Sequence, residues 1–358
     1  MPPFQPAPQG AHESVPRIAV VGGGAFGRNH LRVYRELESL QPGEVELAAL
    51  IEPDPTRRAE LASFYDIPAF ASVEEALHSR QHFHAASVCV PTIHHAAVAE
   101  QLLAVNIDVL IEKPFAASLA EADRVLALAE RHQRILQIGH LERFNPAVTA
   151  AAQRITRPMF FEAHRLSVFT PRSLDVDVVL DLMIHDLDIV LSLTQSRVKE
   201  VRAVGLPVLS PKVDIANVRV EFDSGCVANF TASRVSTEQV RKLRLFQPHE
   251  YLSLDFARQE LLTIKVDPTL IAQLSSGKSF DAAQLAAAEH SHPSPGLSLE
   301  KLDPPRAEPL RLELENFLNA VRSRKQPRVS GAAGREALAL ALEINQQIAG
   351  HAARAGLV

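Results

Sequence analysis

Residues 17–27 read RIAVVGGGAFG, an apolar run that leads directly into a glycine-rich turn. The first five residues of this stretch have the composition of a buried β-strand, and residues 29–40 have the apolar spacing of a helix. Gly22, Gly24 and Gly27 lie between the two segments in the pattern G-x-G-x-x-G. A strand, this turn and a helix in succession predict a phosphate-binding unit, because the amide groups that begin the helix are free to bind an anion.

Each glycine of the pattern has its own expected role. Gly22 permits the tight turn, Gly24 lets the backbone approach a pyrophosphate, and Gly27 allows the helix to pack closely on the strand. Ala25 and Phe26 belong to the same turn and are expected to contact the same ligand. The pattern therefore predicts a dinucleotide site.

Strand-like and helix-like segments alternate as far as residue 138. After the first strand, the expected strands are residues 45–51, 85–90, 108–111 and 135–138, with a helical segment between each pair. Strands that alternate with helices of this length predict βαβ units and a parallel sheet. Beyond Gly139 the pattern changes to strand-like runs with short turns, such as Asp223-Ser224-Gly225, which predict antiparallel pairing.

We therefore expect an α/β protein of two domains. Residues 17–140 should form an N-terminal Rossmann domain with a parallel sheet. Residues 141–358 should form a C-terminal α+β domain with a large, mostly antiparallel open sheet that binds the substrate. Residues 1–16 are expected to be a flexible tail, and residues 273–309, which are rich in Ala, Ser and Pro, a mobile loop.

Bulk properties exclude several classes of protein. The 358 residues fit two domains, and a net charge of −5 with interspersed signs argues against a nucleic-acid-binding surface. No charge-free apolar run is long enough to span a membrane, and the N-terminal residues lack the pattern of a secretion signal. Cys89 and Cys226 lie in apolar runs and are expected to be buried thiols, which favours a cytoplasmic location.

Glu52 is predicted to select the cofactor. It ends the second strand, at the spacing expected of a carboxylate that binds the adenosine ribose of a dinucleotide. A carboxylate at this point repels a 2′-phosphate, so it favours NAD over NADP. Arg57 and Arg58 follow it and leave NADP possible as the less favoured cofactor.

Two further segments follow strands that should end at the ligand crevice. Pro91 and His95 follow the strand that ends near Val90 and are predicted to contact the cofactor, although His95 could simply begin a helix. Glu112 and Lys113 follow the next strand and are predicted to lie near the nicotinamide. The alternative for Lys113 is a solvated lysine at a strand end.

Lys113 also fits the chemistry of alcohol oxidation, which needs a base for the hydroxyl proton and a partner for the developing alkoxide. Asp181 and His185 are spaced i, i+4 in residues 178–193, so they share one face of an expected helix, where the carboxylate can orient the imidazole. The alternatives are a polar pair inside a buried helix or a metal site. A third metal ligand at suitable spacing is missing, so no metal is expected.

These motifs resemble those of the Gfo/Idh/MocA oxidoreductases, a family of sugar and cyclitol dehydrogenases. They are GGGAFG, the EKP of residues 112–114 and the DLMIHDLD of residues 181–188, and the resemblance runs from about residue 17 to residue 348. It implies a Rossmann domain followed by a domain whose open sheet joins subunits, and hence a homodimer or homotetramer. It also implies that Lys113, Asp181 and His185 are the catalytic residues, without deciding whether Lys113 or His185 removes the proton.

A narrower resemblance concerns residues 139–146, GHLERFNP, and residues 178–193. Both are similar to the bacterial subgroup that oxidises the 3-hydroxyl of UDP-N-acetylglucosamine to a 3-keto nucleotide sugar, which an aminotransferase converts to the 3-amino sugar of lipid A. Met183 stands where a glycine is common in the wider family, so inositol or glucose specificity is not implied. The alternatives are another sugar or cyclitol dehydrogenase, such as a UDP-N-acetylglucosaminuronate 3-dehydrogenase, or a non-catalytic NAD-sensing regulator.

A UDP-sugar carries a diphosphate, so its site requires cations. Guanidinium groups pair well with phosphate, and the expected substrate contacts are Arg143, Asn145, Arg165, Arg172 and His185. The alternatives are that the arginines are ordinary surface residues and that Asn145, which precedes a proline, begins a helix.

Overall fold

The protein is represented by a computed structural model that describes residues 15–169, 176–276 and 296–356. Nearly all of the predicted tail, residues 1–16, lies outside the described residues, as does Arg172. The chain forms two compact units. The first contains the described residues up to Leu141 together with Glu308–Ala339, and the second contains Glu142–Ala307 and the residues from Leu340 onward.

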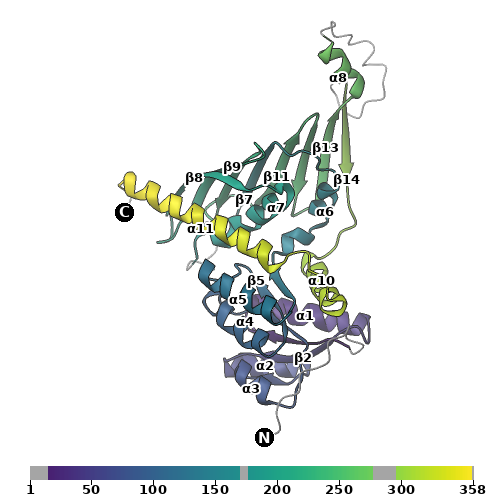
Figure 1. The fold of residues 1–358 in the computed structure, drawn as a ribbon, viewed down its shortest axis with the longest axis vertical. Coiled ribbons are helices and arrows are strands. Elements are labelled where there is room, and N and C mark those ends of the chain that lie inside the picture. The colour runs from purple at the N-terminus through teal and green to yellow at the C-terminus, as the bar shows by residue number, and fades with distance from the viewer. Residues whose placement is uncertain (1–14, 170–175, 277–295, 357–358) are drawn as a thin grey trace. The chain divides into compact units, whose positions relative to one another are not determined.

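The first unit is built on a six-stranded sheet in the order β3-β2-β1-β4-β5-β6, and all its strand pairs are parallel. The strands are β1 Arg17–Val21, β2 Glu46–Ile51, β3 Ala69–Phe70, β4 Ala85–Val88, β5 Asp108–Glu112 and β6 Leu136–Gly139. The helices are α1 Ala25–Leu40, α2 Pro55–Tyr65, α3 Val73–His78, α4 His95–Ala104 and α5 Leu119–Arg131, with a 3₁₀ turn at Thr92–His94 (Figure 1). The strand order reverses between β1 and β4, and ligands of such sheets bind beyond the carboxyl ends of the strands at this point.

A helix from the C-terminal part of the chain completes the core of this unit. Helix α10, Pro309–Ser323, packs on α1, and Leu314 and Phe317 are fully buried in the same apolar cluster as Ile18 and Leu31. The prediction that residues 141–358 form one domain was therefore wrong for residues 308–339. The apolar face of α10 fits the core beside α1, so the chain returns to the first unit before it continues through α11, Gly331–Arg354.

The second unit contains an eight-stranded sheet in the order β14-β13-β12-β11-β7-β10-β9-β8. Among the described strands of this sheet, only the β7–β10 pair is parallel, so the predicted mostly antiparallel sheet is confirmed. The strands are β7 Phe160–Leu166, β8 Val198–Leu206, β9 Ile215–Phe222, β10 Val227–Ser233, β11 Val240–Gln247, β12 Glu250–Asp255, β13 Glu260–Val266 and β14 Leu297–Leu302. The helical segments are the 3₁₀ turn Leu141–Phe144, α6 Pro146–Ala152, the π-helix Val179–Met183, α7 Ile184–Thr194 and α8 Pro268–Ser275.

The predicted mobile loop, residues 273–309, contains regular structure. Helix α8 ends at Ser275, and β14 pairs antiparallel with β13 from Leu261 to Val266. Residues 277–295 of the predicted loop lie outside the described residues. The strand was missed because LSLEKL is a short run that pairs with only one neighbour, and edge strands have a weaker apolar pattern than central ones.

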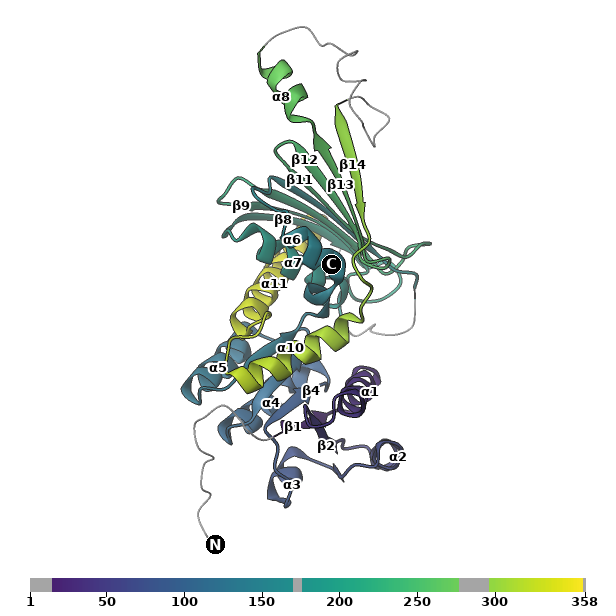
Figure 2. The ribbon, with the colours of Figure 1, turned by 90° about the vertical axis from the view of Figure 1, so that its right-hand side faces the viewer.

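The sheet of the second unit has two different faces. Helices α6 and α7 lie on one face of the sheet (Figure 2). Helix α6 packs on β12 and β13, α7 packs on β7, and the π-helix packs on β10. We call the face that carries these helices the inner face and the opposite one the outer face. Along β7 the side chains alternate between fully buried and partly exposed, as expected of a sheet that is covered on one face.

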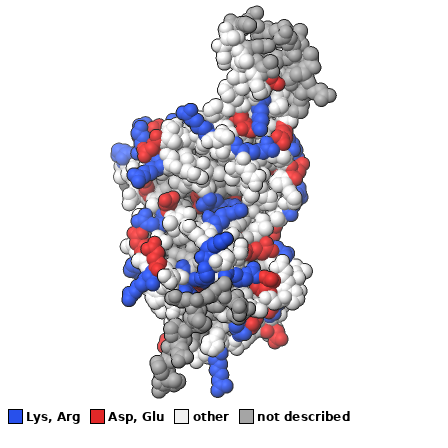
Figure 3. All heavy atoms as spheres, turned by 45° about the vertical axis from the view of Figure 1, so that its right-hand side comes forward, with Lys and Arg blue, Asp and Glu red and all other residues white. Residues whose placement is uncertain are grey.

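Charged side chains of both signs are intermixed on the surface drawn in Figure 3. Many of them pair locally, such as Arg28 with Glu60 and Arg244 with Glu162. Exposed pairs of this kind are screened by water and contribute little to stability. Within the described residues, no helix is both long enough and apolar enough to cross a membrane.

Candidate active site

The three pattern glycines of the first unit meet different surroundings. Gly22 has a φ of +97°, and a Cβ there would lie 2.7 Å from the carbonyl oxygen of Cys89. A Cβ on Gly27 would lie 1.8 Å from the carbonyl oxygen of Gly22. A Cβ on Gly24 would have no protein atom within 4 Å. The fold therefore requires glycine at Gly22 and Gly27, whereas Gly24 leaves open space in which a ligand can approach the protein backbone.

Helix α1 begins at this open turn. Its N-cap is Gly24, and no side chain caps its first amide groups. In contrast, Asp54, Ser72 and Ser118 cap the N-termini of α2, α3 and α5. The first turn of α1 therefore keeps unpaired donors and the positive end of the helix dipole, which suit a pyrophosphate. Ala25 and Phe26 are exposed at the same turn.

Glu52 lies at the carboxyl end of β2, directly beside the glycine-rich turn. Its Oε2 accepts a hydrogen bond from the amide of Gly23 at 2.7 Å, and its Oε1 accepts one from the amide of Asp54 at 2.9 Å. Arg57 lies 3.8 Å from Oε2, while Arg58 donates to the backbone oxygen of Glu52. The structure thus brings the carboxylate, the glycine-rich turn and one candidate cation together at one end of the sheet.

His95 does not face a ligand site. The side chain is buried, with Nδ1 2.9 Å from the oxygen of Pro114 and Nε2 2.9 Å from the oxygen of Val90. Burial lowers its pKa, and the two carbonyl contacts oppose that effect. The prediction that the His95 side chain binds the cofactor is corrected: it ties the loop after β4 to the segment after β5. Pro91 is exposed in that loop, and its cofactor contact stays a prediction.

Glu112 ends β5 inside the protein. Its Oε1 lies 2.9 Å from Nε2 of His30 on α1, and its Oε2 accepts a hydrogen bond from the amide of Lys113 at 3.3 Å. A Cβ on the neighbouring Gly139 would lie 3.0 Å from this carboxylate. A carboxylate held in this way supports the backbone of Lys113, so the predicted cofactor contact of the Glu112 side chain is corrected to a supporting role. Sequence reasoning missed His30, whose partner lies 82 residues away.

Lys113 itself is partly exposed at the carboxyl end of β5, and its bond to Pro114 is cis. β5 adjoins β4, the strand beside the point where the sheet order reverses. Side chains that leave this edge can reach a ligand in the crevice. The cofactor-binding and catalytic roles of Lys113 stay predictions.

In the second unit, Asp181 and His185 are both partly exposed, but the helix that carries them is not regular. Val179–Met183 is π-helical and α7 begins at Ile184, so the predicted single helix of residues 178–193 contains a break in its hydrogen-bond pattern. Such π-helical turns occur frequently at functional sites. Met183 is fully buried in the core. Among the described residues, no cluster of His, Cys, Asp or Glu is arranged to hold a metal ion.

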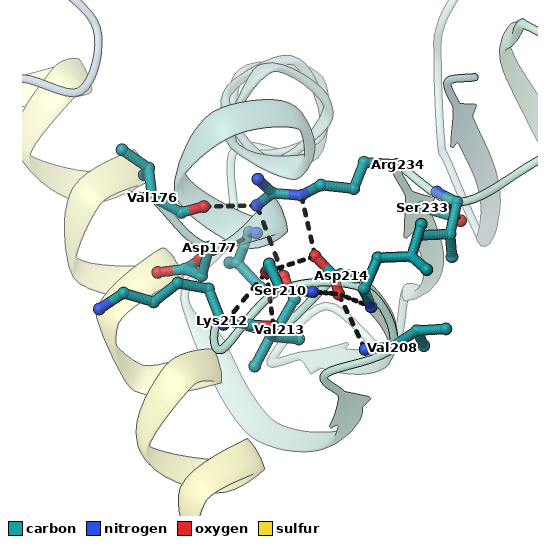
Figure 4. Close-up of polar contacts among 12 residues, drawn as sticks. Val176, Asp177, Val208, Ser210, Lys212, Val213, Asp214, Ser233 and Arg234 are labelled. Carbon is teal, nitrogen blue, oxygen red and sulfur yellow. Dashed lines mark hydrogen bonds and ion pairs between the residues drawn. The ribbon is translucent and has the colours of Figure 1, made fainter. Parts of the chain in front are cut away.

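A polar network holds the start of this π-helix (Figure 4). Asp177 accepts hydrogen bonds from the amides of Val179 and Leu180 at 2.9 and 3.0 Å, and from Nδ2 of Asn345 on α11 at 3.0 Å. Arg234 donates to the backbone oxygen of Val176. The turn before Asp181 is therefore fixed by residues from distant parts of the chain, which the sequence alone did not identify.

Asp214 anchors Arg234 from the other side (Figure 4). The side chain is buried, and one oxygen accepts three backbone amide hydrogen bonds, from Val208, Leu209 and Ser210, at 2.7–2.8 Å. Its other oxygen accepts from the hydroxyl of Ser210 at 2.7 Å and lies 3.5 Å from Nε of Arg234. Burial alone would raise the pKa of Asp214, but the hydrogen bonds from Ser210, Val208 and Leu209 outweigh it and lower the pKa to about 2.

Arg165 is not available to a diphosphate. It is only 3% exposed, and it donates to both carboxylate oxygens of Asp186, at 2.9 and 2.8 Å, and to Glu142 at 3.1 Å. Its guanidinium also lies over the ring of Phe256, 5.2 Å from the centroid. The prediction that Arg165 binds the substrate was therefore wrong, because a buried guanidinium needs carboxylate partners and has found two.

The other predicted substrate contacts near Arg165 are also engaged within the unit. Asn145 is 1% exposed and caps α6 through the amide of Ala147, while its Nδ2 donates to Glu142 and to the backbone oxygen of Phe256. This corrects the substrate role of Asn145 in favour of the alternative, a helix start. Nε of Arg143 donates to the buried Asp188 at 2.8 Å, so this arginine holds α7 and has limited freedom to bind a ligand.

Similarity to known proteins places this geometry in a family. Residues 16–140 match the family described as "Oxidoreductase family, NAD-binding Rossmann fold", and residues 149–246 match the "GFO/IDH/MocA C-terminal domain". An inositol 2-dehydrogenase from Leifsonia xyli is 28% identical over 193 residues, which is 52% of this chain and 55% of that protein.

A UDP-N-acetylglucosamine 3-dehydrogenase from Acidithiobacillus ferrooxidans is 35% identical over 329 residues, which is 92% of this chain and 96% of that protein. A solved structure of the same enzyme superposes with a TM-score of 0.81 at 34% identity, over 93% of this chain and 97% of that one. Both domains thus match one family along almost their whole length. The chain belongs to the Gfo/Idh/MocA oxidoreductases, which bind NAD(P) in a Rossmann domain and act on CH–OH groups.

Proposed function

We propose that this enzyme oxidises the 3-hydroxyl of UDP-N-acetylglucosamine with NAD. The observation that carries the proposal is the 35% identity, across 92% of the chain, to a UDP-N-acetylglucosamine 3-dehydrogenase. The inositol 2-dehydrogenase from Leifsonia xyli matches only 52% of the chain. Similarity that extends through both domains supports a shared substrate class more strongly than similarity over about half of the chain.

The residues of the first unit suit NAD. The open space at Gly24 and the uncapped start of α1 would receive the pyrophosphate, and the Glu52 carboxylate beside them would bind the adenosine ribose. When bound, NAD accepts the hydride that leaves C3 of the sugar. Glu52 would repel the additional phosphate of NADP, which makes NAD the expected cofactor.

The remaining chemistry is a proton transfer. In the proposal Lys113 or His185 removes the proton of the C3 hydroxyl, and Lys113 stabilises the alkoxide by its charge. Asp181, one helical turn before His185, orients the imidazole. Contacts that hold the backbone at these residues support such roles. Glu112 and His95 bind the backbone around Lys113, and Asp177 accepts hydrogen bonds from the first amide groups of the π-helix that carries Asp181.

The proposal is tested by following NADH production with a panel of sugars. UDP-N-acetylglucosamine should be oxidised much faster than free N-acetylglucosamine, myo-inositol or UDP-N-acetylglucosaminuronate. Mass spectrometry should find a product two mass units lighter, as expected for loss of two hydrogens at C3. Efficient oxidation of a free sugar or cyclitol, without inhibition by UDP, would overturn the substrate assignment and leave the family assignment intact.

We further propose that copies of the chain associate through the outer face of the second unit's sheet. Phe160, Phe246 and Tyr251 form an aromatic row there, with neighbouring ring centroids 5.6 and 4.9 Å apart, and Phe246 is 39% exposed. Light scattering should find a homodimer or homotetramer, and Phe246→Glu should shift it towards the monomer. A monomeric wild-type protein at micromolar concentration would overturn this proposal.

The product of the proposed reaction indicates which reaction follows it. A 3-keto nucleotide sugar is a substrate for an aminotransferase, and we propose that it supplies the 3-amino sugar of lipid A. We also place the enzyme in the cytoplasm, whose reducing conditions agree with the free thiols Cys89 and Cys226. A coupled reaction with a nucleotide-sugar aminotransferase and an amino donor should yield the amino sugar only if the keto product forms.

A further inference from the structure

Arg241 is an arginine on the inner face of the second unit's sheet that sequence reasoning did not single out. It is the second residue of β11, whose side chains alternate between the two faces. Leu243 and Leu245 are fully buried beneath the helices, whereas Lys242 is exposed and Arg244 pairs with Glu162 on the outer face. Arg241 shares its face with the two leucines, so its side chain lies on the same side of the sheet as the π-helix and α7.

The strand register places Arg241 next to the buried ion cluster. It lies directly opposite Arg165 in the β7–β11 pair, and Arg165 is bound on both sides by Asp186 and Glu142. Burial raises the pKa of Asp186, Arg165 lowers it, and Arg241 contributes a smaller lowering. The charge of Arg241 thus acts on Asp186, which is the residue that follows His185 in the chain.

The guanidinium of Arg241 differs in its contacts from those of the neighbouring arginines. The nitrogens of Arg165 bind two carboxylates, and Arg143 binds Asp188. The side chain of Arg241 is partly exposed and forms no hydrogen bond and no direct ion pair with any residue that the structure describes. A guanidinium presents five donors in a planar fork that matches phosphate oxygens, so this group is equipped for an anionic ligand.

We propose that Arg241 recognises the diphosphate of the nucleotide-sugar substrate, the role that the sequence had assigned to Arg165. The inference rests on the proposed function, because only a nucleotide sugar brings a diphosphate to this face. Arg165 contributes indirectly: it neutralises Asp186 and Glu142, which would otherwise repel a bound anion. Arg241 then supplies the accessible positive charge on the face that carries Asp181 and His185.

The test compares four full-length proteins: wild type, Arg241→Ala, Arg241→Lys and the control Arg244→Ala. Arg244 lies on the same strand but on the outer face. Calorimetric titration of the NAD-loaded proteins with UDP should show affinity weakened about tenfold to a hundredfold in Arg241→Ala, the range for a lost hydrogen-bonded charge contact. Arg241→Lys should recover part of the affinity, because it keeps the charge and loses the fork. Arg244→Ala should match the wild type.

Kinetics separate recognition from a general structural effect. With UDP-N-acetylglucosamine, Arg241→Ala should raise KM by a similar factor and change kcat less, since the lost contact is remote from C3. NADH affinity, followed by cofactor fluorescence, and the thermal midpoint of Arg241→Lys should stay near the wild-type values. If wild type and Arg241→Ala bind UDP with equal affinity, the inference is wrong even when the wild type oxidises the UDP-sugar. If the wild type ignores UDP and oxidises another sugar, the proposed function fails, and the diphosphate role fails with it.

Discussion

Arg165, Glu142 and Asp186 form an ion cluster inside the second unit, with side chains that are 4%, 8% and 3% exposed. Removing one partner of such a cluster costs about 3–5 kcal/mol, because it leaves an unpaired buried charge. The cluster joins the 3₁₀ turn at Leu141–Phe144, strand β7 and helix α7. At the scale of single residues its function is therefore to fix α7, the helix that begins with Ile184 and His185.

Turnover should depend on Lys113 and His185 individually. Lys113→Ala and His185→Ala should each lower kcat by about 10²-fold or more, the usual contribution of a positioned acid or base. NADH affinity, measured by cofactor fluorescence, should remain within a few-fold of the wild type for His185→Ala. Lys242→Ala, which removes an exposed lysine from the outer face, serves as the control and should keep full activity. A variant at Lys113 or His185 with near-normal turnover would remove that residue from the mechanism.

We also expect single residues to decide the choice of cofactor. Glu52 is buried beside the glycine-rich turn, and Arg57 is the nearby cation with a side chain 40% exposed. Wild type should bind NADH more tightly than NADPH. Glu52→Gln should narrow that difference by removing the negative charge, whereas Arg57→Ala should widen it. Fluorescence titration with both reduced cofactors measures each ratio, and tighter binding of NADPH by the wild type would show that Arg57 dominates.

At the scale of elements, the π-helix Val179–Met183 depends on residues outside itself. Asp177 accepts hydrogen bonds from its first two amide groups and from Asn345 of α11. Arg234 donates to the preceding backbone oxygen of Val176 (Figure 4). An unusual helical turn persists only where surrounding contacts determine it. The loop after β8 is therefore linked to the backbone before the π-helix that carries Asp181. The link is Arg234, which contacts both Asp214 and the backbone oxygen of Val176.

Because the pKa of Asp214 is lowered, its contribution to the stability of the fold should depend on pH. The folded-state value of about 2 lies below the ordinary 3.8, so the ionised carboxylate stabilises the fold above about pH 4. The difference corresponds to about 2 kcal/mol, which is lost as the pH falls from about 4 towards 2. Asp214→Asn should therefore be less stable than wild type by about that amount at pH 7. Urea unfolding at pH 7, 5 and 3 should show the gap constant at first and smaller at pH 3; a gap independent of pH would contradict the assignment.

At the scale of the whole molecule, each unit is completed by residues far away in the chain. The core of the first unit includes α10, which follows the last strand of the second unit's sheet. Phe317 on this helix is fully buried with Leu31 and Leu314 in one apolar cluster. The dinucleotide-binding unit is therefore not formed by the N-terminal residues alone.

Phe317→Ala tests this arrangement. Loss of a buried aromatic ring should destabilise the first unit by about 3–5 kcal/mol. Calorimetric scans with and without NADH identify the transition of the first unit, since only a unit that binds NADH is stabilised by it. Phe64→Ala is the matched control, because Phe64 belongs to the same unit and is 77% exposed. Equal effects of the two substitutions would show that α10 is not part of that core.

Features that depend on neighbours in the chain were predicted from the sequence. The strand, glycine-rich turn and first helix follow from apolar spacing and from the conformations that Gly22 and Gly27 alone permit. The parallel and antiparallel sheets follow from the lengths of the connections between strands. The position of Lys113 at a strand end follows in the same way, since the apolar run Asp108–Glu112 stops directly before it.

Tertiary structure alone decided which polar groups are engaged. Arg165 is paired with residues 21 and 23 positions away, and the His30–Glu112 contact spans 82 positions. Arg241 lies beside Arg165 only through the register of β7 and β11. Burial removes water from a charge and forces it to find partners, and those partners are set by contacts between distant segments. The sequence therefore determined the fold class and the strand-end lysine, while the packed sheet determined that Arg165 is bound internally and that Arg241 lies beside it, partly exposed.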